Sequence, residues 1–256
     1  MLLKLGSKGN EVSLLRNKLN ISSGDIFDIE CENAVKQFQK DHGLKVDGIV
    51  GDKTWLLLND NIIYDPLSTH ITKIVNRDLK YIVIHFTAGS NSKPGKARGV
   101  KKVFEQRAAS ADFCVDDRDI VQFNPDIKNY YCWAVGDKLK QSVGGGKLYN
   151  IATNKNTINI EVCSTCNPST IQGVSYANHK GWSFTEASLE NTRKLVRILM
   201  KRYNIDKNHV IRHYDVTGKQ CPGLVGWNDE PIVNIFNTKT GMNSTSDEWI
   251  KFKNSL

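Results

Sequence analysis

No stretch of this 256-residue sequence approaches the roughly 18 consecutive apolar residues that indicate a membrane-spanning helix, so we expect no stable membrane insertion. The N-terminus also lacks the features of a signal peptide. Its apolar run breaks at Lys4, and no small-residue cleavage site follows. We therefore expect synthesis in the cytoplasm without a signal peptide, so that any extracytoplasmic role needs another route out of the cell.

Internal repeats and low-complexity tracts are absent too, and the length fits one or two packed domains. The 35 Lys and Arg residues exceed the 27 Asp and Glu residues and give a formal net charge of +8. A basic protein is attracted to nucleic acid, anionic lipid or anionic cell-wall polymers, and charge does not choose among them. The basic residues are spread rather than clustered, which favours a solvated basic surface.

A second C-x-x-C pair at zinc-finger spacing is also missing. The six cysteines of a protein without a signal peptide are expected to be reduced rather than paired. The single Cys163-Ser-Thr-Cys166 is interpreted as loop thiols, with a redox or metal element as the alternative.

Residues 1–58 predict a small unit of three helices. Apolar residues recur at spacings of three and four in two segments, and a glycine-rich turn region precedes a third short helix. The residues that carry this pattern are Val12, Leu15 and Leu19; Ala34, Val35, Phe38 and Gln39; and Thr54-Trp-Leu-Leu-Leu.

This segment resembles the peptidoglycan-binding domain family, a three-helix module found beside wall hydrolases. The matching residues are Leu5-Gly-Ser-Lys-Gly9, Ala34-Val-Lys-Gln-Phe-Gln39, Gly43-Leu44, Asp47-Gly48, Val50-Gly51 and Thr54-Trp55. The family usually has a further Asp-Gly before the middle helix, where this chain reads Gly24-Asp-Ile-Phe-Asp-Ile-Glu30. A structural bundle would need the same apolar residues, so the turn glycines and the tryptophan favour the specific interpretation.

Residues 59–78 are expected to be a linker, and residues 79–256 a catalytic domain. In the latter, predicted strands alternate with predicted helices, which indicates an α/β domain with a mixed central sheet flanked by helices. The strands are expected at 81–86, 157–163 and 210–213, with a hairpin at 112–123; the helices at 95–107, from an N-cap at Thr185 through Tyr203, and around Trp249.

One loop places His213 and Cys221 eight residues apart, with Lys219 between them. A neutral imidazole and a thiolate are ligands that suit zinc. His85, at the end of the first strand of this domain, is the third candidate, although a lone histidine in such a strand is also consistent with a core residue. Three protein ligands would leave one tetrahedral position open for water, as a catalytic zinc site requires. The pattern therefore predicts a hydrolytic Zn²⁺ centre.

Glu161 lies on the polar face of a strand whose other face is aliphatic, and it is suited to accept a proton from water. The alternative is a surface glutamate on a half-exposed strand. Lys219 could reach the same centre and stabilise a developing oxyanion, and its alternative is a solvated lysine.

Residues 79–227 resemble the zinc-dependent N-acetylmuramoyl-L-alanine amidases of the type-2 family. The residues that carry the resemblance are Ile82-Val-Ile-His85, Ser110-Ala-Asp-Phe-Cys-Val-Asp116, Trp133-Ala-Val-Gly136, Asn154-Lys-Asn-Thr-Ile-Asn-Ile-Glu161, Arg212-His213 and Gly218-Lys219-Gln-Cys221-Pro222. The resemblance implies that His85, His213 and Cys221 bind zinc, that Glu161 is the base and that Lys219 stabilises the tetrahedral intermediate. Asp112 and Ala134 stand where the family often has histidine, and we expect these differences to concern substrate contacts.

The sequence thus predicts a peptidoglycan hydrolase that cleaves the amide between N-acetylmuramic acid and the L-alanine of the stem peptide. A phage endolysin fits the missing signal peptide, with a bacterial autolysin or a secreted effector amidase as alternatives. The expected partner is peptidoglycan, with no nucleic-acid partner, and a monomer is expected. The rivals are a non-catalytic peptidoglycan-recognition protein, whose relatives typically lose the cysteine ligand, and an amidase whose N-terminal unit only stabilises the fold.

Overall fold

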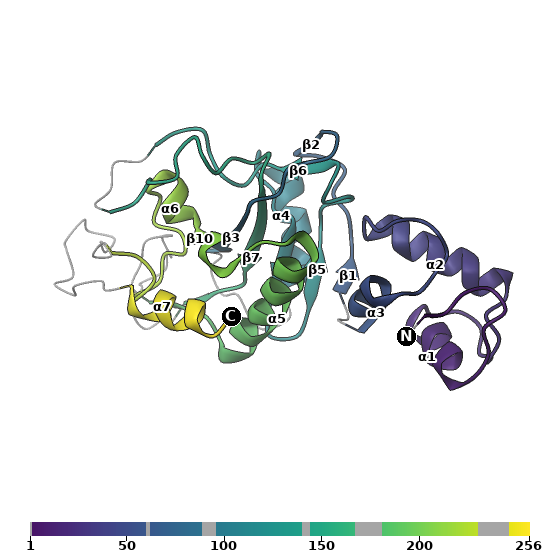
Figure 1. Cartoon of the computed structure of the whole chain (residues 1–256). Coiled ribbons are helices and arrows are strands. Elements are labelled where there is room, and N and C mark those ends of the chain that lie inside the picture. The colour runs from purple at the N-terminus through teal and green to yellow at the C-terminus, as the bar shows by residue number, and fades with distance from the viewer. Residues whose placement is uncertain (1, 60–61, 89–95, 140–143, 167–180, 230–245) are drawn as a thin grey trace.

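The computed structural model describes residues 2–59, 62–88, 96–139, 144–166, 181–229 and 246–256 (Figure 1). Its N-terminal part contains three helices, α1 (Asn10–Lys18), α2 (Ile29–Asp41) and α3 (Asp52–Asn59). The helices enclose a small apolar core made of Leu3, Val12, Leu15, Phe27, Cys31, Val35, Val50, Trp55 and Leu58. The three-helix prediction is confirmed. The helical periodicity identified Val12, Leu15 and Val35 as core positions, but Ala34 is only half-buried and the core residue Cys31 was not predicted.

A buried amide closes the turn between α2 and α3. The side-chain oxygen of Gln39 accepts hydrogen bonds from the backbone nitrogens of Asp47 (3.1 Å) and Gly48 (2.8 Å). Gly48 has a φ of +70°, and a Cβ there would lie 2.8 Å from Cγ of Glu32. The backbone geometry of this turn therefore requires glycine at position 48.

A six-stranded mixed sheet forms the centre of the second part, in the order β1-β5-β4-β7-β3-β10. The strands are β1 (Ile62–Tyr64), β3 (Tyr81–Phe86), β4 (Phe113–Val115), β5 (Ile120–Gln122), β7 (Thr157–Val162) and β10 (Val210–Arg212). Only the β4–β5 pair is antiparallel among these neighbours, and it forms the predicted hairpin. Two small antiparallel sheets pair β2 (Ile71–Lys73) with β6 (Tyr130–Cys132), and β8 (Thr165–Cys166) with β9 (Trp182–Ser183).

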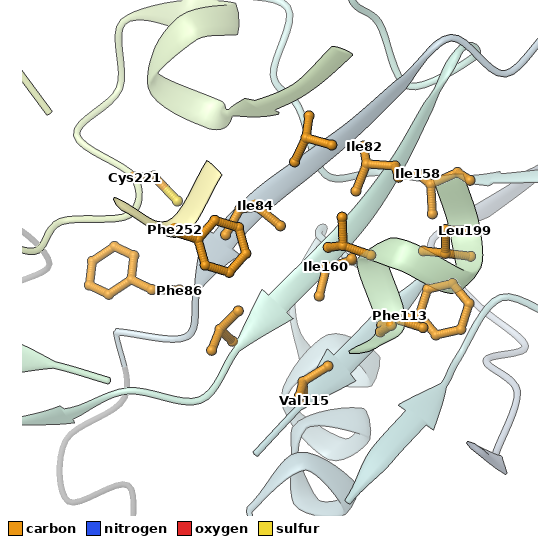
Figure 2. Packing of buried hydrophobic residues seen from close by; sticks show 14 of the residues in the cluster. Ile82, Ile84, Phe86, Phe113, Val115, Ile158, Ile160, Leu199, Cys221 and Phe252 are labelled. Carbon is orange, nitrogen blue, oxygen red and sulfur yellow. The ribbon is translucent and has the colours of Figure 1, made fainter. Parts of the chain in front are cut away.

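The two faces of the central sheet pack against different helices. One face carries Ile82, Ile84, Ile158 and Ile160, which pack with Leu199 of α5 (Glu186–Tyr203) (Figure 2). Phe252 of α7 (Asp247–Asn254) joins the same cluster. On the opposite face, α4 (Val100–Gln106), which follows the 3-10 turn η1 (Ala97–Gly99), contributes Phe104 to a cluster with Cys114 and Val121. This second face also carries the polar residues of the candidate site.

The helix predictions of this part are confirmed in type, and α5 matches its prediction residue for residue. The Thr185 hydroxyl caps α5 by accepting from the backbone nitrogen of Ser188 at 3.1 Å. A second 3-10 turn, η3 (Lys207–His209), precedes β10, and α6 (His213–Thr217) follows it. Within the part of the chain that the structure describes, no helix is both long and apolar enough to cross a membrane.

The segment 59–78 differs from the expected linker. Residues 62–64 form β1, which pairs in parallel with β5 at the edge of the central sheet, and residues 71–73 form β2. Arg77 is buried, and its guanidinium donates to the backbone carbonyls of Ile127 (3.0 Å) and Asn154 (2.9 Å). These strands have three residues each, too few for an alternating pattern to stand out, and they pair with strands of the second part.

Candidate metal centre

The parallel register of β3 and β7 brings two of the predicted site residues together. His85 and Glu161 are direct partners across this strand pair. Their neighbours Ile84, Phe86 and Ile160 point into the apolar core, so strand alternation turns His85 and Glu161 to the opposite face. The predicted polar face of β7 is confirmed.

The other two candidate ligands reach the same place through a tight turn. β10 pairs with β3 on its other side, and Arg212 is the register partner of Ile84. His213 follows at the first position of α6, and Gly218 ends this short helix with a φ of +77°. The chain then turns back, so that the backbone nitrogen of Tyr214 donates to the carbonyl of Cys221 at 3.0 Å.

His85, His213 and Cys221 form a compact group whose possible ligand atoms all lie within 4.8 Å of one another. Nδ1 of His85 is 3.7 Å from Sγ of Cys221, and the two imidazole ring centres are 4.8 Å apart. All three side chains are at most 4% exposed. Nδ1 of His213 is buried without a hydrogen-bond partner among the described residues, as expected of an atom that serves as a metal ligand. Two imidazoles and one thiol in this arrangement can hold a metal ion.

Burial sets the protonation states of this group in the metal-free protein. It lowers the pKa of His85 to about 3 and the pKa of His213 well below its usual value, and the nearby positive charge of Lys219 acts in the same direction. Both imidazoles are therefore neutral near neutral pH, the form that binds metals. Burial also raises the pKa of the Cys221 thiol to about 12, so this thiol must release its proton when it binds a cation.

Glu161 lies beside His85 across the β3–β7 pair and lines the same pocket as His213 and Cys221. The residue as a whole is only partly buried, but its Oε2 atom is fully buried without a hydrogen-bond partner among the described residues. Burial raises the pKa of Glu161 to about 8, against the opposing effect of Lys219. A carboxyl group whose pKa lies near neutral pH can both accept and return a proton.

Two adjoining pockets meet over the candidate centre. One contains His85, Glu161 and Cys221, and also Lys96 and Arg107. The other extends past Tyr131, Tyr149 and Asn154. The lining residues that both pockets share are Ala109, Trp133, Ala134, His213 and Lys219. Lys219 is exposed at this junction, so its ammonium group is available to a bound substrate.

The structure also shows functional neighbours that the sequence patterns did not identify. The side-chain oxygen of Asn159 is 3.1 Å from Nε2 of His85. Asp112 was expected to affect contacts with the substrate. It is instead fully buried, and its carboxylate accepts a hydrogen bond from the backbone nitrogen of Asn159. Asn159 precedes Glu161 by two residues on the same strand face, which is the one sequence signal for its position. Cys114 and Cys163 are also in contact, with 3.7 Å between their sulfur atoms.

Comparison with curated proteins identifies relatives of part of this chain. Among curated proteins, the chain is similar to the N-acetylmuramoyl-L-alanine amidase CwlL of Bacillus licheniformis, with 27% identity over 56% of this chain and 36% of the relative. It is also similar to the N-acetylmuramoyl-L-alanine amidase CwlH of Bacillus subtilis (strain 168), with 30% identity over 58% of this chain and 50% of the relative. The chain thus spans half or less of the length of these two relatives.

Among solved structures, the catalytic domain of XlyA aligns with 76% of this chain and 98% of its own, at 22% identity and a TM-score of 0.49. The sequence profile of a peptidoglycan binding domain matches residues 8–58. The profile of N-acetylmuramoyl-L-alanine amidase matches residues 75–224, more than half of the 256 residues. The chain therefore belongs to the N-acetylmuramoyl-L-alanine amidase family and carries a peptidoglycan binding domain ahead of its amidase domain.

Proposed function

We propose that this protein hydrolyses peptidoglycan at the amide between N-acetylmuramic acid and the L-alanine of the stem peptide, and that His85, His213 and Cys221 hold Zn²⁺ for this reaction. The observation that carries the proposal is the compact, buried group of these three side chains, which lines one pocket together with Glu161. Histidine nitrogens and cysteine thiolates both bind zinc, and three protein ligands leave the fourth tetrahedral position open, as in catalytic zinc sites.

The zinc ion, when bound, would supply a Lewis acid that makes water more acidic and polarises the scissile carbonyl. The side chains of the protein perform the remaining steps. Glu161 accepts a proton from the attacking water and returns it to the leaving amine of L-alanine. Lys219, at the junction of the two pockets, stabilises the negative charge that develops on the carbonyl oxygen. The expelled amine and the new carboxylate of the lactyl group are the products.

Chelation tests the proposed reaction directly. Purified protein should release stem peptides with a free L-alanine amino group from isolated wall, should lose this activity after metal removal, and should regain it with zinc. Mass spectrometry of the released fragments identifies the bond that is cut. If the protein binds wall but releases no peptide, both without metal and with zinc, the proposed hydrolase activity is contradicted. That result would indicate a non-catalytic recognition protein.

The N-terminal helices are expected to bind wall by themselves, because residues 8–58 match a peptidoglycan binding domain with its own apolar core. A fragment of residues 1–58 should sediment with insoluble wall. The full chain should hydrolyse dilute wall faster than a fragment of residues 62–256, since binding raises the local substrate concentration. If the full chain and the 62–256 fragment hydrolyse wall at equal rates, and a folded 1–58 fragment does not sediment with wall, these helices have a purely structural role.

The release of the enzyme in a phage lysis programme, its monomeric state and the absence of a nucleic-acid partner stay predictions. An autolysin or a secreted effector would use the same residues for the same chemistry. Lysis of a host that expresses this chain only when a membrane pore is co-expressed would support the endolysin role, and lysis without the pore would contradict it.

A further inference from the structure

A chain of buried polar groups lies directly behind His85. Arg77, Asp112 and Asn159 are each at most 1% exposed. They come from three separate segments, before β3, before β4 and on β7. The apolar clusters of this domain surround them, so each polar atom needs a protein partner.

The hydrogen bonds of Asn159 fix the orientation of its amide group. The amide nitrogen donates to a carboxylate oxygen of Asp112 (3.2 Å) and to the hydroxyl of Thr157 (3.1 Å). A carboxylate can only accept, so the NH₂ group must be on this side. The amide oxygen therefore points to Nε2 of His85, 3.1 Å away.

Asp112 is itself held from several directions. It accepts from the backbone nitrogen of Asn159 (2.7 Å) and from the side-chain nitrogen of Asn124 (2.5 Å), and Arg77 lies 3.5 Å away. Arg77 donates in turn to the backbone carbonyl of Asn154, just before β7, and to that of Thr157, the first residue of β7. The amide of Asn159 is thus part of a rigid frame and cannot rotate freely.

We propose that Asn159 is a positioning residue for the metal ligand His85. Because its amide oxygen only accepts, Nε2 of His85 must carry the hydrogen, and the lone pair is on Nδ1. Nδ1 is the atom that faces Sγ of Cys221 at 3.7 Å. Asn159, framed by Asp112 and Arg77, therefore selects the tautomer and the ring orientation that binding requires. This role rests on the proposed zinc site, and it concerns the ligand geometry rather than the reaction.

Zinc affinity of the full chain tests this role. Asn159→Leu keeps the size of the side chain but removes the acceptor, and it should weaken zinc binding by about 10- to 100-fold in competition with a chromogenic chelator. Gln122→Leu is the matched control. Gln122 is an equally buried amide that donates to the carbonyl of Asn124 at 2.9 Å, and it has no hydrogen bond to His85 or Asp112 among the described residues. The control should change zinc affinity by less than about threefold. Equal losses in the two folded variants would overturn the proposal.

The tautomer provides a second measurement that does not depend on the stability of a variant. In ¹⁵N-histidine spectra of the metal-free wild-type chain, His85 should show a protonated Nε2 and an unprotonated Nδ1. The His85 signals are assigned as those missing from His85→Gln. A protonated Nδ1 would overturn the proposal, even if the protein proves to be an active zinc amidase. A wild-type chain that binds no zinc would instead contradict the proposed function, while this spectrum still reports on Asn159.

Discussion

Replacing Cys221 with serine is expected to abolish both zinc binding and wall hydrolysis. A serine hydroxyl does not ionise to replace the thiolate, and two neutral imidazoles alone bind zinc weakly. We expect zinc affinity to fall by more than the roughly 100-fold loss that removal of a partner outside the ligand set can cause. Metal content after desalting and release of stem peptides from wall measure the two effects.

Cys163→Ser is the matched control for this variant. Cys163 is a buried thiol that lines the same pocket as Cys221 but lies outside the ligand group. The control should keep its zinc, while a Cys221→Ser protein with stoichiometric zinc would contradict the ligand assignment. Because the pKa of the Cys221 thiol is raised to about 12, binding releases a proton, and zinc affinity of the wild type should increase with pH.

Glu161→Gln is expected to separate metal binding from turnover. The amide keeps the shape of the side chain but cannot accept a proton, so the variant should retain zinc and lose about 10²- to 10⁴-fold in kcat. The pH dependence of the activity is a second, independent test of Glu161 as the base. Glu161 must be ionised to act as a base, and burial raises its pKa to about 8 in the metal-free protein. Wild-type activity should therefore rise with pH through the pKa of this group, which a bound cation will lower, and this limb should vanish in the variant.

Glu105→Gln serves as the control, because Glu105 is exposed on α4 and does not line either pocket of the site. It should leave the rate and the pH profile unchanged. If Glu161→Gln turns over at the wild-type rate, another group is the base.

The strongest sequence patterns predicted the structure accurately, because one local cause determined each of them. The helix from Glu186 to Tyr203 begins at a threonine cap and keeps one apolar face over its whole length. The strand that carries Glu161 alternates strictly between aliphatic and polar side chains. Patterns of this kind depend on nearest neighbours along the chain, so they can be read without knowledge of the tertiary structure.

The patterns failed where strand pairing decides the outcome. Residues 62–64 become a strand only because β5 offers them an edge, and three residues carry no visible period. Arg77 lies within the expected linker, yet it is buried, and the backbone carbonyls to which it donates make this burial favourable. The proximity of His85 to the loop of His213 and Cys221 likewise depends on β10 pairing with β3. Chemical suitability and family resemblance supported that grouping, but sequence spacing alone could not.

The short connection between the wall-binding helices and the sheet has a consequence for how wall would be degraded. α3 ends at Asn59 and β1 begins at Ile62, so three Cα–Cα steps, about 11 Å at most, separate the two elements. With a long flexible spacer, one enzyme bound at a single point of the wall could reach bonds in many neighbouring peptidoglycan chains. Here an anchored enzyme could reach only bonds at a nearly constant offset from its anchor. We therefore expect distributive degradation, in which each new cut requires release and rebinding.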